Sequence, residues 1–397
     1  MVLKPAFEKN FCCIAVSCSE EYVPYLSVYL QSIKEHASNN YNYDVVVFER
    51  GISDDRKEQL QKFTECGNIV LRFVNPLSLI ENCNLSFPAH YNLECYFRLV
   101  SPLILKEYKK ILFTDVDLIF QQDPMILYKK DIKNYPLAAC KDLMWGAMLN
   151  HKDARDWISY ALNTLNLEKP YEYFNTGVML LNVNIFNQKK YSKKLLELVS
   201  STTFRILEQD GLNTFFKTDI YYLDTAWNYP VAYGRYIDLL SYMPEENMKQ
   251  YLKDKNNPYI IHYAGESKPW CYPEEEKASI WWQYARKTPF YTEILSRFIQ
   301  FRSQVAINKS DATKGIREEF IKVHFPNINS RFVNTEYRQH LLFVIDHINY
   351  FRLKKFIYSI LKLVLSKSNK EKYRQKCQVV SRILKDAKQL QKCMYGV

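Results

Sequence analysis

Apolar residues in the first hundred positions occur in short runs, and stretches with a helical period separate them. Residues 11–16, 44–48 and 68–74 are apolar runs of strand length. Residues 25–36 carry apolar side chains at helical spacing, and Ser53 begins a second helix with two acidic residues in its first turn. This alternation predicts an α/β fold with a mainly parallel sheet, helices on both faces and ligands at the carboxyl ends of the strands.

Two carboxylates stand inside the apolar segment at residues 109–120. The segment has the length of a buried strand, and a turn signal follows it at residues 121–124. In an extended chain Asp115 and Asp117 share a face, with their Cα atoms about 6.5–7 Å apart. Two anions beside an apolar strand repel each other, and a divalent cation relieves that repulsion. The pair predicts a metal site, although turns and helix caps use the same spacing.

Residues 173–182 form another apolar run, and its entry is polar. Asn175 offers both a donor and an acceptor, and Gly177 permits close approach of the backbone to a ligand. An ordinary turn before a core strand has the same composition, so these two residues alone do not distinguish the alternatives.

Residues 259–263 end a further apolar run, in which His262 is followed by Gly265 and Lys268. A single histidine at this position is most often a structural residue. With a lysine six positions later it is a candidate metal ligand beside a cation that binds phosphate.

Several other polar residues lie where the predicted strands end or helices begin. Arg98 can pair with a carboxylate or phosphate, or form a surface salt bridge. Gln209 and Asp210 open an amphipathic segment, where acidic groups also favour the helix dipole. Tyr22, in the loop after the first strand, is placed to stack on a nucleotide base. The glycine-rich fingerprint of an ordinary dinucleotide site is missing.

The chain has 397 residues and a net charge of +11, and the charge is localised. Residues 331–397 contain fifteen Lys and Arg against four Asp and Glu, so the preceding part is neutral. Length and charge together predict one large domain at residues 1–290 and a helical, basic C-terminal extension at residues 291–397.

The extension carries an apolar stripe with basic residues beside it. The stripe comprises Leu353, Phe356, Ile357, Ile360, Leu361 and Val364. One interpretation is an interfacial helix on the anionic surface of the inner membrane, and the other is a helical subdomain packed on the body or on a partner chain. Nucleic-acid binding is disfavoured, because no recognition motif accompanies the charge.

Compartment is indicated by the cysteines and by the first residues. The ten cysteines lack paired metal-type spacing, and residues 1–20 lack the pattern of a signal peptide. No run reaches the ~18 apolar residues of a membrane span. We therefore expect a cytoplasmic protein, with the extension as its only membrane-associated part under the first interpretation.

Five motifs in this order resemble glycosyltransferase family 8, the retaining nucleotide-sugar transferases that include bacterial lipopolysaccharide galactosyl- and glucosyltransferases and glycogenin. The motifs, which begin at residues 96, 112, 174, 209 and 262, are Tyr-x-Arg-Leu, Leu-Phe-x-Asp-x-Asp, Phe-Asn-x-Gly-Val, Gln-Asp-x-Leu-Asn and His-Tyr-x-Gly-x-x-Lys-Pro-Trp. The likeness covers residues 11–291. It departs from many members at Ser19 and Glu21, where those members have aspartate and asparagine.

The resemblance implies a GT-A type, Rossmann-like domain that binds UDP-glucose or UDP-galactose and an oligosaccharide or lipid-linked acceptor. Asp115, Asp117 and His262 would hold Mn²⁺, or Mg²⁺, against the diphosphate. The other implied donor-site residues are Tyr22 on uracil, Ser17, Ser19 and Val116 beside the nucleotide, Gly265 and Lys268 at the diphosphate, and Arg98 and Asp142 at the sugar. Those implied at the reaction centre are Asn175, Gln209 and Asp210.

Retention of anomeric configuration usually requires a carboxylate nucleophile, and Gln209 is a poor nucleophile. We therefore expect the acceptor hydroxyl to attack on the face from which UDP departs. Two alternatives stay open: a glycogenin-like primer that glucosylates itself, and a non-catalytic scaffold with a transferase fold.

Overall fold

A computed structural model describes residues 2–85, 93–151, 155–231 and 239–303. The chain divides into two compact units, Met1–Ser303 and Gln304–Val397. The first unit extends past the predicted boundary at residue 290. Residues 291–303 are helical, Ile294 is buried, and Arg297 donates to the carbonyl of Glu21. The predicted apolar stripe and basic extension lie, from residue 304 onward, outside the described residues.

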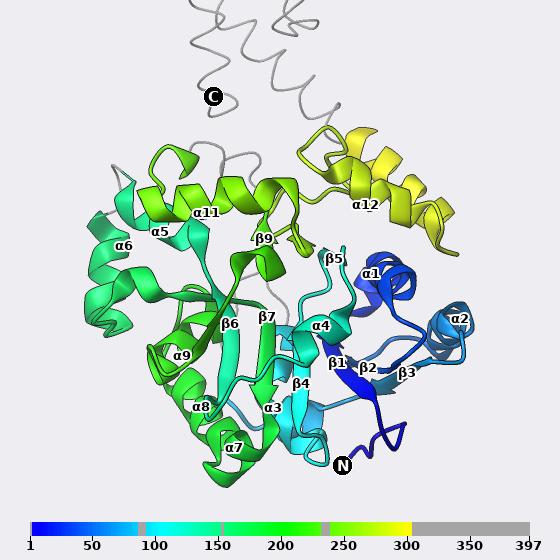
Figure 1. The fold of residues 1–397 in the computed structure, drawn as a ribbon, viewed down its shortest axis with the longest axis horizontal. Helices are drawn as coiled ribbons and strands as arrows, with labels where there is room; N and C mark the ends of the chain where they lie inside the picture. Colours follow the sequence, from blue (N-terminus) through cyan, green and yellow to red (C-terminus); the bar gives the residue numbers. More distant parts are fainter. Residues whose placement is uncertain (1, 86–92, 152–154, 232–238, 304–397) are drawn as a thin grey trace, which may run out of the picture. The chain divides into compact units, whose positions relative to one another are not determined.

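A mixed seven-stranded sheet forms the centre of the first unit, with the order β3-β2-β1-β4-β7-β6-β8 (Figure 1). Its strands are β1 (Phe11–Ser17), β2 (Asn42–Phe48), β3 (Ile69–Val74), β4 (Lys110–Thr114), β6 (Leu137–Lys141), β7 (Phe174–Asn182) and β8 (Tyr221–Leu223). All neighbouring pairs are parallel except the two that β7 makes with β4 and β6. The predicted α/β fold with a mainly parallel sheet is confirmed.

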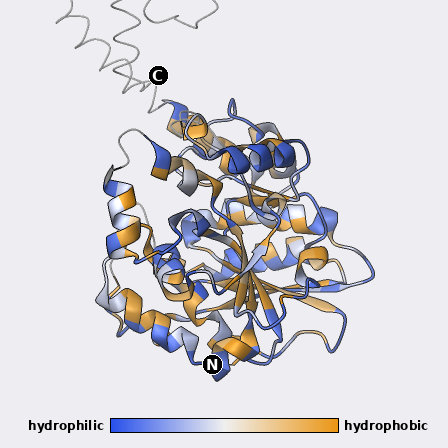
Figure 2. Ribbon diagram, turned by 60° about the vertical axis from the view of Figure 1, so that its left-hand side comes forward, coloured by the Kyte–Doolittle hydropathy of each residue, from blue (hydrophilic) through white to orange (hydrophobic). Residues whose placement is uncertain are grey.

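The sheet is buried on both faces, which explains its unbroken apolar runs. Along β1, Ile14 and Val16 belong to one core and Cys13 and Ala15 to the other, because successive side chains point to opposite faces. Figure 2 shows the same result, with hydrophobic strands at the centre and hydrophilic residues on the surrounding helices.

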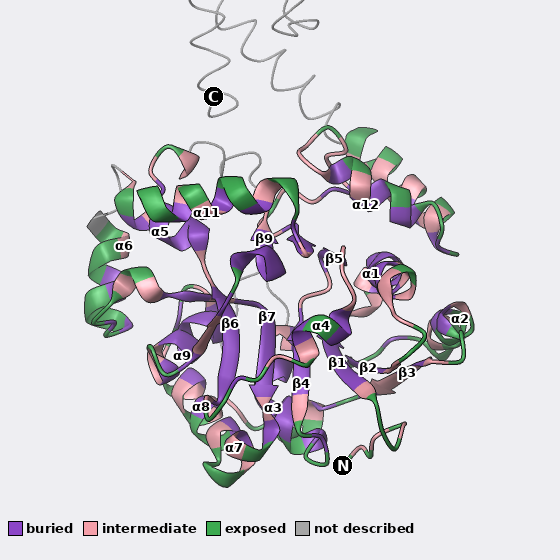
Figure 3. Cartoon of the chain, viewed as in Figure 1, coloured by how far each residue is buried: buried purple, intermediate pink, exposed green. Residues whose placement is uncertain are grey.

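One core lies under α1, α4, α11 and α12, and the other under α3 and α7 to α9. The outer faces of α2, α6 and α11 are exposed (Figure 3). The helices are α1 (Val23–His36), α2 (Asp54–Thr64), α3 (Phe97–Ile104), α4 (Pro124–Tyr128), α5 (Leu143–Asn150), α6 (Arg155–Ser159), α7 (Val183–Gln188), α8 (Tyr191–Ser201), α9 (Leu207–Phe216), α11 (Glu245–Asn256) and α12 (Ala278–Ala285). Among the described residues, no helix has the length and apolarity needed to cross a membrane.

A small second sheet, β5-β10-β9, adjoins the carboxyl end of β4. It consists of β5 (Leu118–Phe120), β9 (Tyr229–Pro230) and β10 (Ile260–His262). The predicted single strand at residues 109–120 is therefore wrong, because it divides into β4 and β5. Asp115 and Asp117 lie in the turn between these two strands rather than on one extended face.

Candidate active site

The register of the two sheets places three distant segments around the turn between β4 and β5. β10 runs antiparallel to β5 with His262 opposite Leu118, and the amide of Tyr263 donates to the carbonyl of Asp117. On the other side the amide of Asp115 donates to the carbonyl of Gly177, in β7. These backbone bonds bring the polar residues of β4, β7 and β10 together.

Asp115, Asp117 and His262 form a group that could hold a metal ion. Nε2 of His262 lies 3.3 Å from Oδ1 of Asp117 and 3.6 Å from Oδ2 of Asp115. The three ligand atoms all lie within 4.8 Å of one another. Two carboxylates and one imidazole form a donor set that suits Mn²⁺ somewhat better than Mg²⁺, which prefers oxygen. The predicted ligands therefore converge, and their chemistry fits a divalent cation.

Two cations flank the acidic pair. The Nζ atom of Lys268 contacts the Asp117 carboxylate and donates to the carbonyl of Tyr263 at 2.9 Å. On the opposite side, Arg98 binds the Asp115 carboxylate and donates to the carbonyl of Thr176 at 2.6 Å. Arg98 is only 5% exposed, so it is a buried ion-pair partner and not a surface cation.

The electrostatic environment shifts the pKa of two of the three candidate ligands. Burial alone would raise the pKa of Asp117, but Lys268 and His262 outweigh burial and lower it. Burial alone would lower the pKa of His262, but Asp117 and Asp115 outweigh burial and raise it. Asp117 is therefore an anion at neutral pH, which is the state that binds a cation.

His262 is positioned by its surroundings and is 4% exposed. Its Nδ1 atom lies 2.8 Å from Oδ1 of Asn228, in the 3₁₀ helix η6 (Thr225–Asn228). The ring packs against Gly177, where an added Cβ would lie 2.3 Å from Cε1 of His262. The predicted close approach at Gly177 is thus made by the His262 ring.

A chain of amide and carboxylate groups continues from His262 to the predicted reaction centre. Nδ2 of Asn228 donates to Oδ1 of Asn175 at 2.8 Å, and Nδ2 of Asn175 donates to Oδ2 of Asp142 at 3.1 Å. Nε2 of Gln209 donates to the same Asp142 oxygen at 3.4 Å. The structure therefore brings Asp142, Asn175 and Gln209 together next to the candidate metal ligands.

Asp210 is oriented differently from its neighbour Gln209. Its carboxylate is 0% exposed and accepts hydrogen bonds from the hydroxyls of Tyr173 and Tyr160, both at 2.6 Å, and from the amide of Ile206 at 2.7 Å. These bonds connect α9 to the neighbouring segments. The contacts give Asp210 a structural role, and its catalytic role stays a prediction.

The end of β1 and the predicted nucleotide loop after it contain two hydroxyls without partners. Oγ of Ser17 and Oγ of Ser19 are buried and make no hydrogen bond with the described residues. Tyr22 is half-buried, with its ring edge-to-face against Trp270 at 6.0 Å. Unpaired buried hydroxyls fit a site that binds a polar ligand.

Two further residues were predicted to contact the nucleotide-sugar, and each lies in a turn between charged or metal-binding side chains. Val116 is half-buried between the two aspartates. Gly265, between His262 and Lys268, has a φ of +86°, a conformation that side-chain-bearing residues rarely adopt.

Sequence reasoning missed Asn228 and Glu208. Asn228 stands in no predicted motif, and only its position between Trp227 and the apolar Tyr229 indicated a buried residue. Glu208 lies in the first turn of α9, where an acidic residue is ordinarily explained by the helix dipole, but its Oε1 atom lies 3.3 Å from Nε of Arg98. Burial raises the pKa of Glu208 to about 7, although Arg98 opposes that effect.

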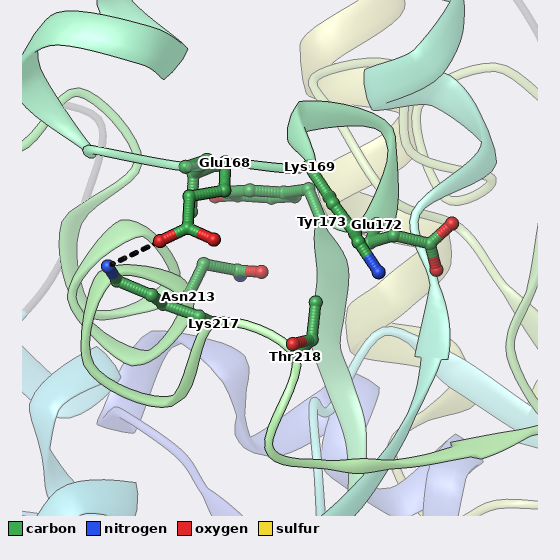
Figure 4. Close-up of a pocket in the computed structure, with 8 residues that line it drawn as sticks. Glu168, Lys169, Glu172, Tyr173, Asn213, Lys217 and Thr218 are labelled. Atoms are coloured by element: carbon green, nitrogen blue, oxygen red, sulfur yellow. Dashed lines mark ion pairs between the residues drawn. The ribbon is translucent and has the colours of Figure 1, made fainter.

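A separate small pocket lies next to the second half of α9 (Figure 4). Its lining residues are Leu167, Glu168, Lys169, Glu172, Tyr173, Asn213, Lys217 and Thr218. Glu168 and Lys217 form an ion pair of 3.9 Å across it. The pocket contains none of the predicted site residues.

Solved structures define the class of this fold. The bifunctional glycosyltransferase WbbM is 26% identical with a TM-score of 0.66, over 75% of this chain and 53% of the WbbM chain. The galactosyltransferase LgtC, solved with donor and acceptor sugar analogues, is 21% identical with a TM-score of 0.55, over 70% of this chain and 96% of the LgtC chain. The fold is that of the GT-A glycosyltransferases.

The family follows from the sequence. The model of glycosyl transferase family 8 matches residues 13–273, and the chain belongs to this family. General stress protein A of Bacillus subtilis is 26% identical over 64% of this chain and 86% of its own length. A lipopolysaccharide 1,2-glucosyltransferase of Escherichia coli is 25% identical over 49% of this chain and 53% of its own length. This chain thus spans about half the length of WbbM and of the Escherichia coli enzyme.

Proposed function

We propose that this protein is a metal-dependent retaining hexosyltransferase that moves glucose or galactose from a UDP-sugar to a saccharide acceptor. The observation that carries the proposal is the convergence of Asp115, Asp117 and His262, with Lys268 in contact with Asp117. A diphosphate is an anionic leaving group, so it is stabilised by positive charge. The two carboxylates and the imidazole would hold a divalent cation for it, and Lys268 adds a second positive charge.

Each group around the turn has a distinct part in holding the donor. Asp115, Asp117 and His262 would hold Mn²⁺, which supplies charge neutralisation for the departing diphosphate when it is bound. Lys268 provides a second positive charge at the same place. The unpaired hydroxyls of Ser17 and Ser19 provide hydrogen bonds for the nucleotide.

The sugar would lie toward Asp142, Asn175 and Gln209. The amide of Gln209 is held at both ends, because Oε1 accepts from the Thr176 amide at 3.0 Å and Nε2 donates to Asp142. A neutral amide is a poor nucleophile, so we propose attack by the acceptor hydroxyl on the face that UDP leaves. The bond from the anomeric carbon to UDP breaks, the bond to the acceptor oxygen forms, and the departing phosphate oxygen takes the hydroxyl proton. A glycosyl adduct on Gln209 or Asp210 in mass spectra would overturn this route.

The acceptor class and location are the broadest part of the proposal. The lipopolysaccharide glucosyltransferase among the relatives supports an acceptor in lipopolysaccharide or another surface glycan. We propose a cytoplasmic enzyme whose basic residues 331–397 bind anionic membranes. Salt-sensitive sedimentation with anionic liposomes should be lost on truncation after Gln339, and sedimentation that is unchanged would reject membrane binding.

A panel of UDP-sugars with Mn²⁺, scored for UDP release, tests the function directly. We expect one hexose donor to be preferred, and Asp115→Asn to reduce turnover at least ~100-fold, because it removes charge from a metal ligand. Asp54→Asn is the matched control, since Asp54 is fully exposed on α2. If Asp115→Asn keeps wild-type turnover, or if chelation has no effect, the metal assignment is wrong. Growth in the intact mass of the protein would instead indicate self-glucosylation.

A further inference from the structure

Asn228 connects two parts of the site, and its hydrogen bonds have a direction. It is 4% exposed, and one side of its amide faces Nδ1 of His262 while the other faces Oδ1 of Asn175. Since an amide oxygen only accepts and an amide nitrogen only donates, the orientation of one group in such a chain determines that of the next.

The orientation of Asn175 is determined by two groups with unambiguous chemistry. Its Oδ1 atom accepts from the backbone amide of Gly177 at 2.8 Å, and a backbone amide can only donate. Its Nδ2 atom faces the carboxylate of Asp142 at 3.1 Å, and an ionised carboxylate only accepts. The oxygen of Asn175 therefore faces Asn228.

The orientation of Asn175 determines the tautomer of His262. Because Oδ1 of Asn175 needs a donor, Asn228 presents Nδ2 to it and Oδ1 to His262. The Nδ1 atom of His262 must then carry hydrogen, at 2.8 Å from that oxygen. The lone pair of the neutral ring is left on Nε2, the atom that faces Asp115 and Asp117.

The backbone holds Asn228 in this place independently of its side chain. Tyr229 pairs with Ile261 in the parallel β9–β10 ladder, and the amide of Val231 donates to the carbonyl of His262 at 3.0 Å. On the other side, the amide of Tyr259 donates to the carbonyl of Ala226 at 2.8 Å. The segment around Asn228 is thus bonded to β10 before and after it.

From this geometry we propose that Asn228 is a positioning residue that holds His262 in its Nδ1–H tautomer and couples the metal ligand to Asn175 and Asp142. The inference rests on the proposed metal-dependent function. It adds a residue that is not one of the three candidate metal ligands but determines which ring nitrogen of His262 can bind a cation. Such partners of a metal-binding histidine affect metal affinity by about 10–100-fold.

The tautomer of His262 can be measured by ¹⁵N NMR of the metal-free protein at pH 8.5. The chain has seven histidines, and the signals missing from His262→Ala identify this one. We expect the wild type to show hydrogen on Nδ1 in every protonation state, with the lone pair on Nε2 whenever the ring is neutral. An Nδ1 atom without hydrogen in the wild type would overturn the proposal, and this measurement does not depend on the folding of any variant.

Two substitutions at residue 228 separate positioning from general packing. In Asn228→Leu, which has a similar volume but no acceptor, we expect loss of the Nδ1–H preference and Mn²⁺ binding about 10–100-fold weaker by EPR of the free ion. In Asn228→Asp, the carboxylate still accepts from Nδ1–H, so the tautomer and most of the affinity should return. Wild-type affinity and tautomer in Asn228→Leu would overturn the proposal.

The same titration in His262→Ala distinguishes this inference from the proposed function. If His262→Ala binds Mn²⁺ as the wild type does, the metal site itself is wrong. If His262→Ala loses Mn²⁺ while Asn228→Leu keeps it, the metal site stands and only the role of Asn228 fails.

Discussion

The ring of His262 lies directly against the backbone of Gly177, so closely that a Cβ atom at residue 177 would be 2.3 Å from Cε1 and 2.8 Å from Nδ1. The two residues belong to different sheets, in β10 and β7. The absence of a side chain at residue 177 therefore allows an imidazole from one sheet to reach the acidic turn beside the other.

Gly177→Ala should displace the His262 ring. We expect Mn²⁺ affinity to fall at least ~10-fold and stability to fall by about 1–3 kcal/mol, because the ring is buried and cannot move without disturbing its neighbours. Metal titration and thermal unfolding measure the two effects. Gly146→Ala is the control, since its Cβ would meet Nδ2 of Asn247 at 2.8 Å and its other nearest atoms belong to Pro244, so no candidate metal ligand is among them. Equal Mn²⁺ affinity in the two variants would contradict the interpretation.

Arg98→Lys should reduce both stability and donor binding, although the substitution keeps the positive charge. The guanidinium contacts the Asp115 carboxylate, the carbonyls of Thr176 and Cys95, and the Glu208 carboxylate. A single ammonium cannot satisfy these groups together, so we expect a stability loss of about 1–3 kcal/mol and a higher KM for the donor.

Arg50→Lys is the matched control for Arg98→Lys. Arg50 also pairs with a glutamate, Glu94, at 2.9 Å, but its side chain is 42% exposed. Its replacement should change stability by less than about 0.5 kcal/mol. Similar losses at the two positions, measured by chemical denaturation, would show that the buried contacts of Arg98 are not important.

Asp210→Ala should reduce stability by about 2–4 kcal/mol, because it leaves the hydroxyls of Tyr160 and Tyr173 without their shared acceptor. A double-mutant cycle with Tyr173→Phe tests the structural role. We expect a coupling energy of about 1–3 kcal/mol, since the two residues share one buried hydrogen bond. Additive effects, together with loss of turnover in fully folded protein, would instead support the catalytic prediction for Asp210.

Glu208→Gln should change the pH dependence of stability. Burial raises the pKa of Glu208 to about 7 from an ordinary value of 4.5, so between these values the folded state binds more protons than the unfolded state. Wild-type stability from this group is present below pH 4.5 and is lost as pH rises through about 7. The variant lacks the effect, so its stability relative to wild type should increase from pH 5 to pH 8 by on the order of 3 kcal/mol.

Thermal unfolding across this pH range measures the Glu208 effect, with the exposed Glu107→Gln as control. A stability difference between Glu208→Gln and wild type that stays constant with pH would show that Glu208 does not titrate in this range.

Much of the fold and several residues of the site could be predicted from local pattern. The apolar runs predicted β1, β2, β3 and β7, because a strand buried on both faces has a continuous apolar sequence. The spacing of Asp115 and Asp117 indicated a cation site from charge alone. The boundary between β4 and β5 was missed, since both strands are apolar and the turn between them has no glycine or proline.

The sequence by itself determined which chemical groups this protein carries and on which kinds of segment they lie. Only the tertiary structure decided which of them meet. His262 reaches Asp117 because β10 pairs with β5, and Asn228 reaches His262 because β9 pairs with β10. Pairing between strands that lie far apart in the sequence depends on packing of the whole core, and local periodicity carries no information about it.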